Sequence, residues 1–206
     1  MELKQSETEQ TLQLINEGMS RAAAALAKLL DREVLITELK VQQGTARETI
    51  KKLHHKDQLI ILQTEVIGDL RGQSFLLLTE PEAIAILEMT LNNHTFEHMG
   101  MEYLKEIDNI LSAAVVAAMA DLLELTIYGD VPHFYKMEGQ ELTSWIEEQK
   151  LSQQFNGTEP EGINFGALLQ IRAPQPINLN FIWYLNKNIL YHIRKLVNSK
   201  SIEGLR

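Results

Sequence analysis

The chain contains no cysteine among its 206 residues. This absence excludes cysteine nucleophiles, thiolate metal ligands and disulfide bonds, and it fits a reducing compartment. Basic residues are also scarce: the chain has 19 Lys and Arg against 28 Asp and Glu, which gives a net charge of −9. An acidic surface argues against nucleic-acid binding, which needs a basic patch, and against docking on an anionic membrane.

Targeting signals, membrane spans and common enzyme motifs are missing as well. Residues 1–10 lack the basic and apolar regions of a signal peptide, and the most apolar stretch, residues 110–120, is too short to span a bilayer. There is no Walker-type glycine loop, His-Glu-x-x-His or Gly-x-Ser-x-Gly motif. Adjacent His54 and His55 have no third ligand nearby, so no metal site is expected. We expect a cytoplasmic protein without membrane insertion and without a cofactor of its own.

Hydrophobic periodicity predicts a fold of mixed helices and strands, in the broad α/β class and of the α+β type. The spacing predicts two long helices near residues 8–30 and 102–125, and further helices near 45–56, 81–91, 139–150 and 187–197. Strand-like runs lie near residues 34–41, 59–67, 74–78, 127–135, 163–171 and 177–185. Short turns join two pairs of these runs into hairpins, which predicts a largely antiparallel sheet.

The order of these elements occurs twice: helix, strand, short helix, hairpin, helix. A shift of 93 residues aligns the two long helices without a gap and places Asn16 on Asn109, with six identities in eighteen positions. We therefore expect one domain, residues 1–206, made of two structural repeats of about 1–95 and 96–206 with pseudo-twofold symmetry.

The helix near residues 102–125 has two distinct faces at 100° per residue. The apolar face, which should lie on the sheet, comprises Ile107, Ile110, Leu111, Ala114, Val115, Ala118 and Leu122. The other face comprises Glu102, Glu106, Asn109, Ala113, Ala117 and Ala120. Glu106 and Asn109 are three residues apart and are neighbours on that face.

Two interpretations of that polar face are open. Small residues let helices approach closely, and most surface Glu and Asn side chains are simply solvated. A flat alanine surface beside a carboxylate and an amide is also one against which a docking partner can lie. A family pattern favours the second interpretation.

The segment EIDNILSAAVVAAMADLLELTIYGDVP resembles the signature of the CheC/CheX/FliY family of response-regulator phosphatases. That signature is Glu, two residues, Asn, twenty-two residues, Pro, and it matches Glu106, Asn109 and Pro132. From average residue usage, a chance match in a chain of this length occurs about once in fifty. The duplicated layout and total length resemble the CheC-like members, which are built of two halves.

The first copy of the signature is degenerate. Gln13 stands where Glu is expected and Leu39 where Pro is expected, so that only Asn16 matches. Glu102 also replaces the Asp or Ser that the family favours four residues before the second-half Glu. We expect one competent site, in the second half.

The resemblance implies an enzyme of chemotaxis or two-component signalling that dephosphorylates a CheY-like response regulator. Asn109 suits the task of orienting the attacking water, because a neutral amide both accepts and donates hydrogen bonds. The family implies that Glu106 pairs with the regulator's active-site lysine, and Pro132 has a structural role next to the site helix. Mg²⁺ is expected in the partner regulator, and CheD, a receptor deamidase, is a further partner that the resemblance implies.

The alternative is a non-catalytic adaptor that binds a response regulator, CheD or a flagellar motor component. Gln13 and Glu102 favour the adaptor, whereas the intact spacing of Glu106, Asn109 and Pro132 favours the enzyme. A small-molecule hydrolase ranks third, because a helix face is not an enclosed pocket.

Overall fold

The computed structural model describes residues 5–44, 58–91, 98–142, 144–145 and 162–203. Its helices are α1 (Gln5–Leu30), α3 (Glu80–Leu91), α4 (His98–Leu123) and α6 (Asn188–Glu203), with the 3-10 helix η1 (Gly139–Glu141). Its strands are β1 (Val34–Gly44), β2 (Gln58–Gly68), β3 (Gly72–Thr79), β4 (Ile127–Gly129), β5 (His133–Glu138), β6 (Gly162–Ile171) and β7 (Ile177–Asn186). The helix expected at 45–56, and most of the one expected at 139–150, lie outside the described residues.

The strands form one seven-stranded sheet in the order β1-β6-β7-β3-β2-β4, with β5 also on β2, and each of these pairings is antiparallel. The predicted α+β fold with an antiparallel sheet is confirmed. The order is symmetric about the centre of the sheet, where the hairpins β2–β3 and β6–β7 meet. The outer neighbours of each hairpin come from the other half of the chain: β4 and β5 pair with β2, and β1 pairs with β6. Neither half therefore has a complete sheet of its own. The duplication stays a prediction, and this order supports it.

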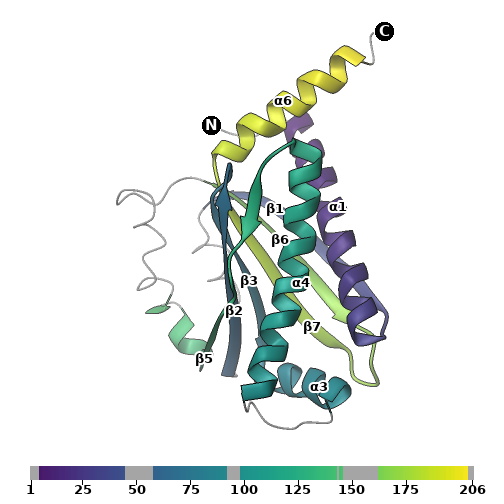
Figure 1. Ribbon diagram of the computed structural model, residues 1–206, viewed down its shortest axis with the longest axis vertical. Helices are drawn as coiled ribbons and strands as arrows, with labels where there is room; N and C mark the ends of the chain where they lie inside the picture. The colour runs from purple at the N-terminus through teal and green to yellow at the C-terminus, as the bar shows by residue number, and fades with distance from the viewer. Residues whose placement is uncertain (1–4, 45–57, 92–97, 143, 146–161, 204–206) are drawn as a thin grey trace.

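Helices α1 and α4 lie side by side along one face of the sheet, with α3 and α6 near opposite ends (Figure 1). The buried faces of both long helices and the sheet residues beneath them form the main hydrophobic core. A smaller cluster on the opposite face joins Phe75, Leu142 and Ile182, with Trp145 packed against it. Within the described residues, no helix is both long and apolar enough to cross a membrane.

The two long helices end in the same way. Asp31 and Glu124, which the 93-residue shift superposes, follow α1 and α4 with φ values of 50° and 54°. The residue after each donates its N–H to the carbonyl five positions back, at 3.1 Å and 3.0 Å. This is the Schellman cap, which glycine fits best because other residues are strained at positive φ. The cap orients the chain toward β1 after α1 and toward β4 after α4.

Replacing Glu124 by glycine is expected to raise the free energy of unfolding by about 0.5–1 kcal/mol, because glycine adopts the left-handed conformation without a Cβ clash. Urea unfolding at constant pH measures the change. Glu124→Ala is the matched control, since it removes the same carboxylate but keeps the Cβ. If Glu124→Gly and Glu124→Ala are equally stable, relief of backbone strain at position 124 does not explain the change.

Candidate functional site

The structure places Glu106 and Asn109 on the exposed side of α4, one turn apart. The opposite side of the helix is buried, as the apolar face predicts. Within the described residues, neither the Glu106 carboxylate nor the Asn109 amide has a hydrogen bond or an ion pair. Both groups are therefore available to a ligand or a partner.

These two side chains line an open depression of about 300 Å³, here called the site depression. Its helix wall comprises Glu102, Lys105, Glu106 and Asn109, and its second wall is the turn of residues 129–132. The three signature residues, Glu106, Asn109 and Pro132, are thus brought together although twenty-two residues separate the last two. The arrangement suits contact with a convex part of another macromolecule, because the depression is not enclosed.

The 129–132 turn is a bulge in the strand that follows α4. Gly129 pairs with Val66 and His133 with Gln63, so three residues of the turn face two residues of β2. The Asp130 N–H donates to the Glu65 carbonyl at 2.9 Å. The single extended segment predicted for residues 127–135 is therefore wrong. It is two strands, because the extra residue breaks the ladder and proline has no N–H with which to restore it.

Pro132 is buried at the base of this turn, whereas the preceding Val131 is 70% exposed. The strand β5 begins at the next residue, as expected for a proline at a strand start. His133 is exposed but does not line the depression among the residues described.

The degenerate first-half residues lie in different surroundings. Gln13 and Asn16 are exposed on α1 and line a separate groove of about 250 Å³, here called the α1 groove, together with Leu122 and Leu196. Among the described residues lining this groove, none belongs to β1.

The first-half counterpart of the 129–132 turn is a much smaller irregularity in β1. The register of β1 against β6 shifts by one residue between Ile36 and Glu38, and the 93-residue shift places Thr37 on Asp130. With Leu39 in place of proline, β1 continues as one strand. Among the described residues, β1 therefore forms no second wall beside Asn16 like that of the site depression.

Charges of both signs meet in the site depression. Lys105 Nζ lies 2.8 Å from Glu102 Oε1 in an ion pair three residues apart on α4. Such a surface pair contributes about 1 kcal/mol or less to stability. It does compensate the charge of Glu102. Among the described residues, the carboxylates of the depression without an ion pair are then those of Glu106 on the helix wall and Asp130 on the turn wall.

A buried polar contact that was not predicted from the sequence lies directly beneath the site helix. Asp108, between Ile107 and Asn109, is fully buried, and its Oδ2 accepts a hydrogen bond from Thr64 Oγ1 at 2.6 Å. Burial raises the pKa of the Asp108 carboxyl from 3.8 to about 7, and the hydrogen bond from Thr64 opposes that rise. The available signal was position: Asp108 precedes Leu111 and Val115 by three and seven residues, on the buried face.

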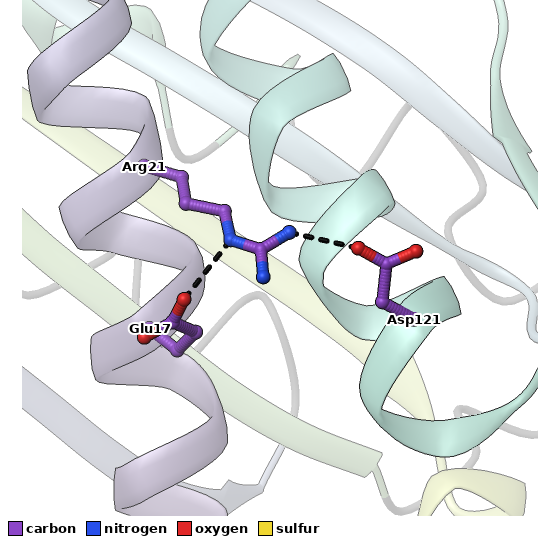
Figure 2. Close-up of polar contacts among 3 residues, drawn as sticks. All are labelled: Glu17, Arg21 and Asp121. Atoms are coloured by element: carbon purple, nitrogen blue, oxygen red, sulfur yellow. Dashed lines mark hydrogen bonds and ion pairs between the residues drawn. The ribbon is translucent and has the colours of Figure 1, made fainter.

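A second missed contact joins the two long helices on their exposed side. The Arg21 guanidinium of α1 contacts Glu17 Oε1 at 3.0 Å and Asp121 Oδ2 of α4 at 2.8 Å (Figure 2). These hydrogen bonds, foremost the one to Asp121, raise the pKa of Arg21. Asp121 is exposed but ion-paired across the helices.

In the described part of the chain, no three His, Asp or Glu side chains gather into a group that could hold a metal ion. His54 and His55 lie outside the described residues. The site depression presents to a partner the carboxylates of Glu106 and Asp130 and the amide of Asn109.

Comparisons with known proteins support the resemblance drawn from the signature. The CheY-P phosphatase CheC of Bacillus subtilis (strain 168) is 28% identical over 127 residues, which cover 57% of this chain and 60% of that protein. The match thus spans less than two thirds of the curated relative's length. No protein-family model matches the chain.

Solved structures share the fold over most of the chain. The crystal structure of Thermotoga maritima FliY has a TM-score of 0.73 at 14% identity, covering 97% of this chain and all of that one. The FliG–FliM complex from H. pylori gives 0.60 at 12% identity, with 88% and 94% covered. The CheX-CheY-BeF3-Mg²⁺ complex from Borrelia burgdorferi gives 0.51 at 14% identity, with 85% and 99% covered.

The signature, the CheC relative and the shared fold agree with one another, and together they confirm the resemblance of this chain to the CheC/CheX/FliY family.

Proposed function

We propose that this chain is a cytoplasmic phosphatase that docks on a phosphorylated CheY-like response regulator and speeds hydrolysis of its aspartyl phosphate. The observation that carries the proposal is the site depression: Glu106 and Asn109 stand exposed and unpartnered among the described residues, beside the turn that Pro132 ends. The relative named CheY-P phosphatase and the neighbour solved as a CheX-CheY complex support the same partner class.

Asn109 positions the attacking water. An aspartyl phosphate is a reactive acyl phosphate, and the regulator's own Mg²⁺ neutralises charge on the phosphoryl oxygens, so the phosphatase needs to add mainly geometry. The amide oxygen accepts a hydrogen bond from the water and holds it in line with the phosphorus. The water oxygen bonds to phosphorus, the bond to the aspartyl oxygen breaks, and inorganic phosphate and the aspartate carboxylate are released.

Glu106 orients the docked regulator rather than acting as a base, because a second anion close to a phosphoryl group is repelled. It pairs with the lysine of the regulator's active site, as the family resemblance implies. Pro132 acts through the backbone: it ends the bulge and so holds the 129–132 turn against the helix wall. The exposed Val131 is placed to touch the regulator beside that ion pair.

The test is the lifetime of the phosphoryl group. A cognate regulator is phosphorylated in Mg²⁺, and phosphate release is followed with and without substoichiometric amounts of the protein. We expect the protein to shorten the lifetime of the regulator's phosphoryl group and to act on several regulator molecules in turn. Binding to the phosphorylated regulator with an unchanged lifetime would overturn the proposal.

The second candidate is an adaptor that binds the regulator, CheD or a motor component without catalysis. The fold is shared with FliM in a FliG–FliM complex, and Gln13 has replaced the first-half Glu. Lifetime and binding measured on one sample separate the two functions.

A charge series at position 106 tests the docking role. Glu106→Gln is expected to weaken binding of the phosphorylated regulator several-fold, because the regulator's lysine then faces a neutral side chain. Glu106→Lys is expected to weaken it by about tenfold or more, because the two lysines repel each other. Isothermal titration calorimetry measures both affinities. Glu88→Lys, an equal change of net charge on α3 at a different pocket, is the control. Equal losses from Glu88→Lys and Glu106→Lys would show that only overall charge matters.

A further inference from the structure

Thr64 of β2 lies beneath both walls of the site depression at once. Its Oγ1 donates to Asp108 Oδ2 at 2.6 Å, and Asp108 directly precedes Asn109 in the helix wall. Its Cγ2 lies next to Gly129, the first residue of the turn wall: a Cβ added to Gly129 would lie 3.3 Å from it. One side chain thus contacts the elements that carry Asn109 and Pro132.

We propose that Thr64 and Asp108 are positioning residues that set the separation between the helix wall and the 129–132 turn. For its catalytic consequence this inference rests on the proposed phosphatase function. Neither side chain can touch a docked regulator, since Thr64 is 1% and Asp108 0% exposed. They act through Asn109 and through the turn.

The surroundings give this contact little freedom. A short hydrogen bond in a buried site is strong, because water does not compete for either partner. The next residue of β2, Glu65, accepts the Asp130 N–H through its carbonyl at 2.9 Å. The turn is thereby held to β2 by a backbone bond at Glu65 and by side-chain packing at Thr64, and α4 is held to the same point of β2 by Asp108.

The fold supplies a matched control one strand away. Ser74 of β3 lies directly opposite Thr64 in the sheet, and its hydroxyl pairs at 3.0 Å with that of Ser112, one helical turn after Asp108. Both serines are buried, so Ser74→Ala also removes a buried hydroxyl bond between α4 and the sheet. Unlike Thr64, Ser74 has no atom within 4 Å of a Cβ added to Gly129.

The experiment compares Thr64→Val with Ser74→Ala. Valine keeps a methyl group against Gly129 but cannot donate to Asp108. Amide hydrogen exchange of Asp130 is expected to speed up about tenfold in Thr64→Val and to stay within twofold of the parent in Ser74→Ala. The dephosphorylation rate at saturating protein should fall about tenfold in Thr64→Val alone, with the regulator Kd within threefold of the parent.

A second variant pair works without breaking the hydrogen bond, should Thr64→Val fold poorly. Gly129→Ala forces the turn away from Thr64 Cγ2 by a few tenths of an ångström, because 3.3 Å is tighter than an ordinary contact. Adding Thr64→Ser removes that methyl group and keeps the hydroxyl. The turn's exchange rate and the dephosphorylation rate should both return to within twofold of those of Thr64→Ser alone.

Equal effects of Thr64→Val and Ser74→Ala, or no rescue of Gly129→Ala by Thr64→Ser, would overturn the inference. The hydrogen-exchange readout separates it from the proposed function. If the parent leaves the phosphoryl lifetime unchanged, the phosphatase proposal fails, whereas the exchange pattern still decides whether Thr64 positions the turn.

Discussion

Replacing Asn109 by alanine is expected to slow regulator dephosphorylation about 100-fold or more while leaving the fold intact. The amide is exposed and makes no hydrogen bond within the described residues, so its loss removes no native contact known to stabilise α4. The effect belongs to the transition state, in which the amide holds the water in line with phosphorus, and a lost positioning group costs about this much. Single-turnover phosphate release at saturating protein measures the rate.

Binding and a first-half control make this result specific. The Kd for the phosphorylated regulator should change less than about threefold in Asn109→Ala, because docking depends on Glu106 and the surface around it. Asn16→Ala, the equivalent change in the α1 groove, should leave the rate unchanged. An Asn109→Ala variant as fast as the parent would show that the amide does not position the water.

Replacing Asp108 by asparagine is expected to stabilise the protein by a few kcal/mol at pH 8. The folded-state pKa of about 7 lies above the value of 3.8 for an unperturbed Asp. Between those pH values the unfolded state releases the proton that the folded state keeps, so the free energy of unfolding falls as pH rises. The loss is about 1.4 kcal/mol per pH unit in that interval. Asparagine has the shape of the neutral acid, accepts the bond from Thr64 and does not ionise.

Urea unfolding of the parent and of Asp108→Asn from pH 4 to pH 8 measures this difference. The two curves should lie close together near pH 4 and diverge as pH rises. Asp31→Asn is the control: Asp31 is exposed, so this variant shows how much the loss of a surface carboxylate alone changes the pH dependence of unfolding. Parallel curves for the parent and Asp108→Asn would contradict a neutral carboxyl beneath the site.

The site helix was predictable because its features are local in sequence. The apolar face of α4 repeats at helical spacing, which alone turns Glu106 and Asn109 toward solvent. The strands were predictable for the same reason, since β-branched runs bounded by turn residues need no tertiary information. The antiparallel sheet followed from the two hairpins.

The second wall of the site depression was only partly predictable. Pro132 marked a strand start, but the bulge depends on how residues 127–135 pair with β2, from the other half of the chain. Asp108 was missed because a carboxylate on a buried helix face is rare, and its hydrogen-bond partner among the described residues, Thr64, lies 44 residues earlier. The exchange of outer strands between the halves also depends on tertiary pairing that local patterns do not encode.

The degenerate first half shows how few changes separate two similar helix faces. Gln13 and Asn16 are exposed on α1, and Glu106 and Asn109 are exposed on α4. With Leu39 in the place of proline, β1 continues as one strand, while Leu196 of α6 lines the α1 groove. The expectation of a single competent site therefore has a structural basis in the missing second wall, and it stays a prediction until both helices are tested.

We expect the phosphorylated regulator to bind at the site depression and not at the α1 groove. Amide chemical-shift mapping with a regulator loaded with Mg²⁺ and beryllofluoride, a stable mimic of the phosphoryl group, tests this most directly. The largest shifts are expected at Glu106, Asn109 and Val131. Shifts confined to Gln13, Asn16 and their neighbours on α1 would contradict it.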